Sequence, residues 1–234
     1  IVDNGSPLTT NLFNLTELTD TFTGSSGKDI FQGVIVGQLA AGTTVTPGDY
    51  IYGGGGAKDT FNISVTGLST GDVNLTGVNA DVEKILFSNF DQRAADSTNY
   101  DASLATGLTT VGLTSSSANG DTVFTGLQNI VDAEMTSGEA DLTVTYLNSV
   151  VSGDSDTSTL TLSGQSGGTF TETSVSAGGL EILNVVSEGS ANEVGITSAR
   201  DTLATVNISG NQDLTTTVTS DAIETINAST FTGD

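Results

Sequence analysis

The 234-residue chain has no cysteine, no histidine and no tryptophan, and it has only two prolines. Without cysteine it forms no disulfide. Without histidine or cysteine it also lacks the usual ligands of transition metals and almost every standard nucleophile–base pair of enzymes. No run of about 18 apolar residues occurs, so we expect no membrane-spanning helix. These absences leave carboxylates and hydroxyls as the main chemical groups of the chain.

Positive charge is also scarce. Five lysine and arginine residues stand against 28 aspartate and glutamate residues, which gives a formal net charge of −23. Nucleic-acid binding needs a positive surface, and an anionic membrane surface would repel this chain. We therefore expect neither a nucleic acid nor a membrane as a partner. So acidic a chain also repels itself unless cations screen or bridge it.

Threonine, serine, glycine, asparagine and aspartate dominate what is present. Short segments such as Leu160–Ser163 put apolar residues on one face and hydroxyls on the other, which is typical of β-strands joined by turns. A template of the form apolar-Glu-x-apolar-Asn-apolar recurs along the chain. Its copies are Val82–Phe87, Leu127–Asp132, Leu180–Val185, Leu203–Ile208 and Ile223–Ala228. The last two intervals, of 23 and 20 residues, suit single turns of a β-solenoid.

These patterns predict an all-β, β-solenoid-like protein with parallel β-roll or β-helix turns. A β-sandwich for part of the chain stays open, because short alternating strands serve both architectures. The polar segment 151–157 suggests a boundary near residue 150. It would separate a β domain with glycine–aspartate turns (1–150) from solenoid-like repeats (151–234).

Asparagine recurs at one position of the template, at Asn184, Asn207 and Asn227. We predict that these side chains stack as an amide ladder inside a corner of the solenoid, where each amide bonds the one above and the one below. The alternative is that asparagine simply favours strand ends and turns.

Two segments near the start, 19–31 and 49–61, place aspartate at fixed offsets from glycines. Asp20 and Asp29 are nine residues apart, and Asp49 and Asp59 are ten apart. The pattern approximates G-G-x-G-x-D-x-U-x, the repeat of calcium-binding β-rolls. Glycines allow the tight turn there, and carbonyl and carboxylate oxygens are the ligands that calcium prefers. Two structural turns, with aspartate as an ordinary turn residue, are the alternative.

The segments that begin at Leu18 and Gly54, followed by Val82-Glu-Lys-Ile-Leu86, resemble the RTX-type calcium-binding surface proteins of Gram-negative bacteria, particularly their S-layer proteins. The resemblance is most specific over residues 18–90. It implies a calcium-stabilised β protein that is exported by type I secretion and assembles outside the cell. Carried over to the matching positions, it implies carboxylate ligands at Asp20, Asp29, Asp49 and Asp59, and backbone-carbonyl ligands at Gly24, Gly27, Gly54 and Gly56.

We therefore expect a self-assembling structural subunit of an extracellular surface layer or filament, with Ca²⁺ as its cofactor. Its main partner would be other copies of itself, and cell-surface polysaccharide is a further candidate partner. The terminal segments 1–12 and 222–234 would exchange strands with neighbouring copies.

A calcium-dependent adhesin that binds carbohydrate or a host surface is the alternative, with sugar contacts from Tyr50, Tyr52, Tyr100 and Tyr146. An enzyme is not expected. The carboxylate pairs Glu181–Asp201 and Asp154–Asp156 could serve as a glycosidase acid and nucleophile. However, a chain without tryptophan and with five basic residues lacks the sugar-stacking and basic groups of such clefts.

Overall fold

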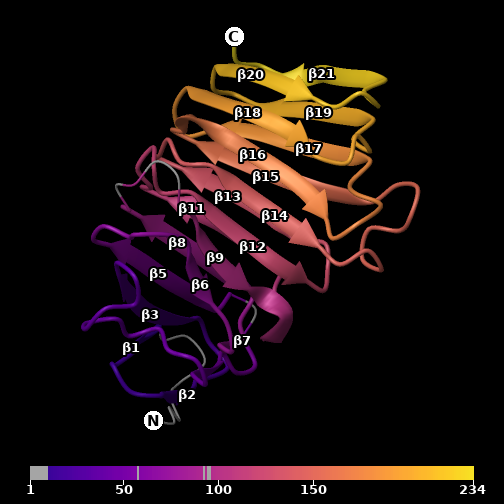
Figure 1. Cartoon of the computed structure of the whole chain (residues 1–234). Coiled ribbons are helices and arrows are strands. Elements are labelled where there is room, and N and C mark those ends of the chain that lie inside the picture. Colours follow the sequence, from indigo (N-terminus) through magenta and orange to yellow (C-terminus); the bar gives the residue numbers. More distant parts are fainter. Residues whose placement is uncertain (1–9, 57, 92, 94–95) are drawn as a thin grey trace.

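The computed structural model describes residues 10–56, 58–91, 93 and 96–234. Nearly all regular structure in these ranges is β-strand, and the strands pair in parallel. They wind into a β-solenoid of about eight turns, in which each coil lies on the one before it (Figure 1). The predicted all-β solenoid is therefore confirmed.

Three parallel sheets form the walls of the solenoid. Sheet 1 consists of β1 (Asn11–Asn14), β3 (Asp29–Val36), β5 (Thr60–Thr66), β8 (Lys84–Asn89), β11 (Thr110–Thr114), β13 (Asp132–Thr136), β15 (Thr157–Ser163), β17 (Ile182–Glu188), β19 (Thr205–Gly210) and β21 (Thr225–Phe231). Sheet 2 consists of β6 (Val73–Leu75), β9 (Thr98–Asp101), β12 (Thr122–Leu127), β14 (Leu142–Tyr146), β16 (Ser166–Ser174), β18 (Asn192–Ser198) and β20 (Leu214–Thr219). Sheet 3 consists of β2 (Thr21–Thr23), β4 (Tyr50–Tyr52), β7 (Asn79–Asp81) and β10 (Ala105–Thr106).

Helix is confined to one short segment of the described chain, the 3₁₀ helix η1 (Ala102–Leu104) between β9 and β10. In the described ranges, no helix has the length and apolar composition needed to cross a membrane.

The cross-section of the solenoid changes along the chain. The first coils pass between sheet 3 and sheet 1, the coils of β5–β6–β7 and β8–β9–β10 visit all three sheets, and from β11 onward the chain alternates between sheets 1 and 2. Sheet 3 is therefore a wall of the N-terminal coils only. Both glycine-rich segments follow strands of this sheet.

Strict alternation within the strands builds the core. In β5, for example, every second residue from Phe61 to Val65 is buried, while the residues between them face outward. Inward residues of one coil stack on those of the next, since Phe31 pairs with Phe61 and Phe61 with Ile85. At the start of the column, the rings of Phe13 and Phe31 stack with their centroids 4.9 Å apart. Burial in such columns supplies the main stabilisation of the coils.

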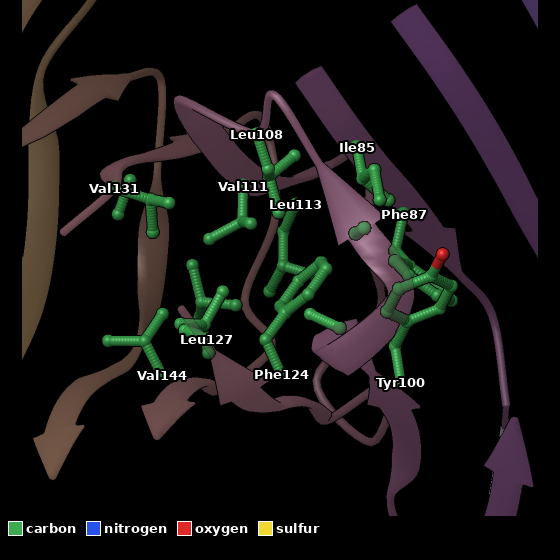
Figure 2. Packing of buried hydrophobic residues seen from close by; sticks show 14 of the residues in the cluster. Ile85, Phe87, Tyr100, Leu108, Val111, Leu113, Phe124, Leu127, Val131 and Val144 are labelled. Carbon is green, nitrogen blue, oxygen red and sulfur yellow. The ribbon is translucent and has the colours of Figure 1, made fainter. Parts of the chain in front are cut away.

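An aromatic cluster joins sheets 1 and 2 in the middle coils (Figure 2). The ring of Phe87 on β8 meets Phe124 on β12 edge-on, with centroids 5.6 Å apart, and meets Tyr100 on β9 at 6.1 Å. Edge-to-face contacts of this kind add to the free energy gained from burial alone. The cluster therefore holds the two walls together where sheet 2 has just begun.

Sheets 1 and 2 run without interruption past residue 150. β13 pairs with β15, and β14 pairs with β16. The segment between β14 and β15 is thus a loop of one continuous stack, and the suggested boundary marks no break in either sheet. Because the described strand pairs are parallel, this part of the chain contains no β-sandwich of antiparallel sheets.

The asparagine ladder is confirmed, but not in a corner. The Asn207 amide donates to Asn184 Oδ1 at 3.0 Å, and the Asn227 amide donates to Asn207 Oδ1 at 3.4 Å. The three residues are register partners on β17, β19 and β21, and they lie on the outward face of sheet 1, beside buried neighbours such as Val206. The predicted corner position was wrong, because an outward strand position in register with its neighbours also allows amides to stack.

The sequence template marks a recurrent corner. Val82, Leu180, Leu203 and Ile223 each stand two residues before a strand of sheet 1. The copy that begins at Leu127 does not fit, since Leu127 ends β12 and pairs with Tyr146 in sheet 2. Ile130, two residues before β13, holds the corresponding position.

Candidate metal centre: the glycine corners

The two glycine-rich segments form neighbouring layers of one corner, between sheet 3 and sheet 1. One connects β2 to β3, and the other connects β4 to β5. The Gly24 amide donates to the carbonyl of Tyr52 at 2.7 Å, and the Gly55 amide donates to the carbonyl of Ser25 at 2.9 Å. The structure thus stacks the two segments that the sequence singled out.

Close backbone packing explains the glycines. A Cβ on Gly24 would lie 2.2 Å from the carbonyl oxygen of Gly53, and a Cβ on Gly54 would lie 2.0 Å from that of Ser25. Gly54 also has a φ of +101°, a conformation that residues with a side chain rarely adopt. Gly56 is equally restricted, because its Cβ would lie 2.2 Å from a carbonyl oxygen of the layer below. The corner therefore needs glycine whether or not it holds an ion.

Acidic side chains connect the coils at this corner. Asp59 Oδ1 accepts a hydrogen bond from the Asp29 amide at 2.7 Å, and Glu83 Oε2 accepts one from the Asp59 amide at 2.7 Å. Asp29 Oδ1 in turn accepts from the side-chain amide of Asn11 at 2.7 Å. Asp29 and Asp59 are almost completely buried. Each acid therefore binds a donor of the preceding coil, and backbone amides that a strand ladder leaves free at the corner gain an acceptor.

The second oxygen of Asp29 is also occupied. Asp29 Oδ2 accepts from the Ser25 amide at 2.7 Å and from the Ser25 hydroxyl at 3.3 Å. The Gly27 amide donates to the Ser25 hydroxyl oxygen at 3.0 Å. Ser25 stands where the calcium repeat has glycine. Its hydroxyl therefore makes hydrogen bonds that a glycine at this position could not make.

Asp20 and Asp49 lie at a different corner. They precede the sheet 3 strands β2 and β4, whereas Asp29 and Asp59 are at the start of sheet 1 strands or directly before them. Asp49 Oδ1 accepts from the Asp20 amide at 2.9 Å, and Asp49 Oδ2 accepts from the Thr46 amide at 2.7 Å. Hydrogen bonds therefore join the four aspartates as two separate pairs, and no bond connects one pair to the other.

The carboxylate of Asp59 is buried close to other acidic side chains. Its burial raises the pKa of Asp59 to about 6; the hydrogen bond from the Asp29 amide lowers the pKa, and the charges of Glu83, Asp29 and Asp81 raise it further. A cation beside Asp59 would remove this repulsion. In the described ranges, no three acidic side chains are grouped so that they could hold a metal ion. A calcium ion here would therefore depend on backbone carbonyls and water as well, both of which are suitable ligands.

Acids serve as inter-coil acceptors throughout the solenoid, which gives the other candidate acids a structural role. Glu181 Oε2 accepts from the Asp156 amide at 2.7 Å, and Asp201 Oδ1 accepts from the Asp221 amide at 3.0 Å. These two bonds involve three of the four acids that the sequence offered as glycosidase residues, Asp156, Glu181 and Asp201. The same arrangement recurs at Asp72, Asp121, Asp132, Asp141 and Asp213.

The four tyrosines divide between the core and the surface. Tyr100 and Tyr146 are fully buried, so the prediction that they contact sugars was wrong; they fill the core instead. Tyr50 and Tyr52 are exposed on the outward face of sheet 3. Tyr50 borders a hollow of about 260 Å³ whose other lining residues are Asn79, Ala80, Asp81, Ser103, Leu104 and Thr106.

Sequence reasoning missed Glu83 and three lysines, Lys28, Lys58 and Lys84, which line a cleft beside the corner. A signal was present, because lysine directly precedes aspartate in both glycine-rich segments. The calcium repeat is defined by its glycine and aspartate positions, so its pattern gives no role to these lysines.

Comparison of the chain with family models, with curated proteins and with solved structures gave no match. The likeness of residues 18–90 to RTX-type surface proteins is therefore a hypothesis based on sequence alone. What the protein does has to be argued from its geometry and charge.

Proposed function

We propose that the chain is a self-assembling structural subunit of a bacterial surface layer or extracellular filament, stabilised by calcium. The observation that carries this proposal is the open edge of the last coil. β20 and β21 are the outermost strands of sheets 2 and 1, and each has one edge that faces no other strand of the described chain (Figure 1). Unpaired strand edges are templates for pairing with another chain.

Side chains of the last coil favour the same contact. Leu214, Val218 and Ile223 are only partly buried against the core, and Ile226 is 55% exposed. A strand added to either edge would bury apolar surface as well as satisfy backbone groups. The segment 222–234, expected to take part in strand exchange, includes β21. Of the other expected segment, 1–12, residues 1–9 lie outside the described residues.

A contact between this edge and the opposite end of a second copy would be head-to-tail. Such a contact uses two different surfaces, so it repeats without closing when the rotation between copies does not complete a ring, and it then produces a filament. Further coils would cover the same edges if the chain extends past Asp234. The proposal is therefore tested on the 234-residue chain itself.

Calcium enters the proposal at the stacked glycine corner. The candidate ligands there are Asp29, Asp59 and the carbonyls of Gly24, Gly27, Gly54 and Gly56. Asp20 and Asp49, at the other corner, would form a separate site if they bind calcium. The negative charges of Glu83, Asp29 and Asp81 around Asp59 and the net charge of −23 both favour binding of a divalent cation. Calcium would supply positive charge that neutralises the corner and reduces repulsion between copies.

Assembly is measured by sedimentation velocity and negative-stain electron microscopy, with calcium and with EDTA. We expect polymers in calcium that shrink or dissociate in EDTA. Ile226→Lys should block assembly, because a lysine on an edge strand opposes pairing. The matched control is Val175→Lys, which changes a side chain of similar exposure (58%) away from the open edge. A chain that stays monomeric in calcium, or an Ile226→Lys variant that still assembles, contradicts the proposal.

A calcium-dependent adhesin is the second candidate, and the exposed pair Tyr50 and Tyr52 favours it. Tyrosine faces stack on sugar rings, and the hollow beside Tyr50 offers Asn79 and Asp81 for hydrogen bonds. Binding to a glycan array that is lost in Tyr50→Ala but kept in Tyr100→Phe would support this function. The absence of binding to any glycan on the array would contradict the adhesin function.

A further inference from the structure

Three of the five basic residues of the chain line a single cleft. Lys28, Lys58 and Lys84 surround a space of about 490 Å³ on the outward side of sheet 1. In a chain with a net charge of −23, random placement would scatter so few lysines among the 28 acids. Their concentration at one place distinguishes this cleft from the acidic remainder of the chain.

Lysines recur in successive coils. Lys28 and Lys58 each stand two residues before a member of the register pair Ile30–Thr60, and Lys84 pairs in register with Thr60. Neighbouring coils of a parallel sheet are about 4.8 Å apart. Lys28 and Lys58 therefore occupy equivalent positions in neighbouring coils, and Lys84, in the next coil, is offset from them by two residues along the strand.

Two of these lysines are not neutralised by an ion pair. Lys84 Nζ binds Glu134 Oε1, whereas Lys28 and Lys58 are exposed and form no ion pair with a carboxylate of the described residues. Glu83 also lines the cleft, and its Oε2 accepts from the Asp59 amide, so its negative charge offsets part of the positive charge of the lysines. Like charges at this spacing repel each other. An anion between them would turn that repulsion into attraction.

The rest of the lining is small and polar, with an aliphatic floor. Hydroxyl and amide groups come from Thr60, Asn62, Thr109 and Thr110, and apolar contact comes from Ile30 and Leu86. A cleft of this kind offers hydrogen bonds for hydroxyl groups, and charge for carboxylate or sulfate groups. It has no deep apolar pocket to receive the aromatic or aliphatic anchors that dominate protein–protein contacts.

We propose that this cleft binds an acidic polysaccharide, with Lys28 and Lys58 holding carboxylate or sulfate groups of successive sugar units. Lys28 and Lys58 come from neighbouring coils, so one glycan chain that lies along the cleft presents anionic groups to both. The hydroxyls bind Thr60, Asn62 and Thr110, and the sugar rings lie over Ile30 and Leu86. The strongly acidic remainder of the protein repels long polyanions such as nucleic acids, which confines binding to a few sugar units.

Isothermal titration calorimetry with hexagalacturonate tests the proposal on the full chain, in EDTA so that calcium does not bridge the acids. We expect saturable binding that weakens as salt is raised, and at least tenfold weaker binding by the double variant Lys28→Gln/Lys58→Gln. The double variant Lys28→Arg/Lys58→Arg keeps the charge and should bind within about threefold of the parent chain. Arg93→Gln, which removes a positive charge outside the cleft, should bind like the parent. Circular dichroism melting confirms that each variant is folded.

Each of the following outcomes would overturn the proposal. Absence of binding to hexagalacturonate and to a sulfated hexasaccharide removes the site. Equal binding by Lys28→Gln/Lys58→Gln places the ligand elsewhere. Inorganic sulfate binding as tightly as the hexasaccharides would show a simple anion site, and equal affinity for neutral maltohexaose would show that charge is irrelevant. If the glycans do not bind but the glutamine variant loses self-association, the occupant is an acidic segment of a second copy.

Discussion

The carboxylate of Asp59 accepts a 2.7 Å hydrogen bond from the backbone amide of Asp29, one coil earlier, and its own amide donates to Glu83, one coil later. This relationship explains much of the acidity of the chain. Corners of a solenoid interrupt the strand ladder and leave amides without partners, and a carboxylate is a strong acceptor for them. The accumulation of negative charge is the consequence, and it is most severe where several acids share one corner.

Asp59 should make the stability of the protein depend on pH. The pKa of Asp59 is raised from 3.8 to about 6 in the folded protein. Stability from a raised carboxyl pKa is fully present below the unfolded value and is lost as the pH rises through the folded one. We therefore expect Asp59→Asn, which keeps an acceptor for the Asp29 amide, to gain melting temperature relative to the parent as the pH rises from 4 to 7. The measurement is thermal melting monitored by circular dichroism in EDTA. The exposed-loop control Asp154→Asn should show no such trend, and a constant offset for Asp59→Asn would contradict the role given to burial.

Calcium should reverse the effect of the same substitution. If the glycine corner binds the ion, saturating calcium at pH 7.5 raises the melting temperature of the parent chain but has a smaller effect on Asp59→Asn, because a binding ligand stabilises only the state that binds it. Calorimetric titration should show a correspondingly weaker affinity in the variant. Equal calcium responses of the two proteins would remove Asp59 from the site.

The protein should be more stable when glutamine replaces Glu172. This residue is fully buried between Val144 and Ser198 of neighbouring coils, and its Oε1 has no hydrogen-bond partner. Burial raises the pKa of Glu172 above its usual 4.5, so its stabilising contribution is lost as the pH rises through the raised value. Glu172→Gln should therefore melt at a higher temperature than the parent at pH 8, and the gain should shrink toward pH 4.5. Glu188→Gln makes the same charge change at an exposed position and should show no comparable gain.

The repetitive part of the architecture was predictable from the sequence. Alternation in segments such as Leu160–Ser163 sets which face is buried, and the template positions at Leu180 and Leu203 mark the corner before sheet 1. These features are local or repeat at nearly constant spacing. The template copy that begins at Leu127 does not mark this corner, because Leu127 ends β12. Apolar spacing alone does not show whether a segment lies at the start or at the end of a strand.

The candidate site was less predictable. Spacing grouped Asp20 with Asp29 and Asp49 with Asp59, whereas the fold joins Asp20 to Asp49 and Asp29 to Asp59. A nine- or ten-residue interval contains one short strand of sheet 3, so it takes the chain from one corner to the next. The pairing follows the length of the whole coil, which glycine spacing does not reveal.

Two glycines should respond very differently to alanine. Gly54→Ala places a Cβ 2.0 Å from the carbonyl oxygen of Ser25 at a φ of +101°, so we expect a loss of at least about 2 kcal/mol in the free energy of unfolding. A Cβ on Gly71 meets nothing within 4 Å, and its φ is outside the positive range. Gly71→Ala should therefore be neutral, or stabilising by about 0.5 kcal/mol, because alanine restricts the unfolded chain. Urea denaturation measures both, and similar losses would contradict the packing of the glycine corner.

The asparagine ladder should contribute measurably, and most strongly at its centre. Asn207 donates to Asn184 and accepts from Asn227, so Asn207→Ala removes two side-chain hydrogen bonds, while Asn184→Ala removes only the one that it accepts from Asn207. A net contribution of about 0.5–1.5 kcal/mol for each hydrogen bond is usual, and partial exposure on the outward face places these two near the lower end. We expect Asn207→Ala to lower the free energy of unfolding by about 1 kcal/mol and Asn184→Ala by about half as much, measured by urea denaturation. Equal losses would mean that the amides act through local strand preference and not through the bonds between coils, because strand preference acts on each residue separately.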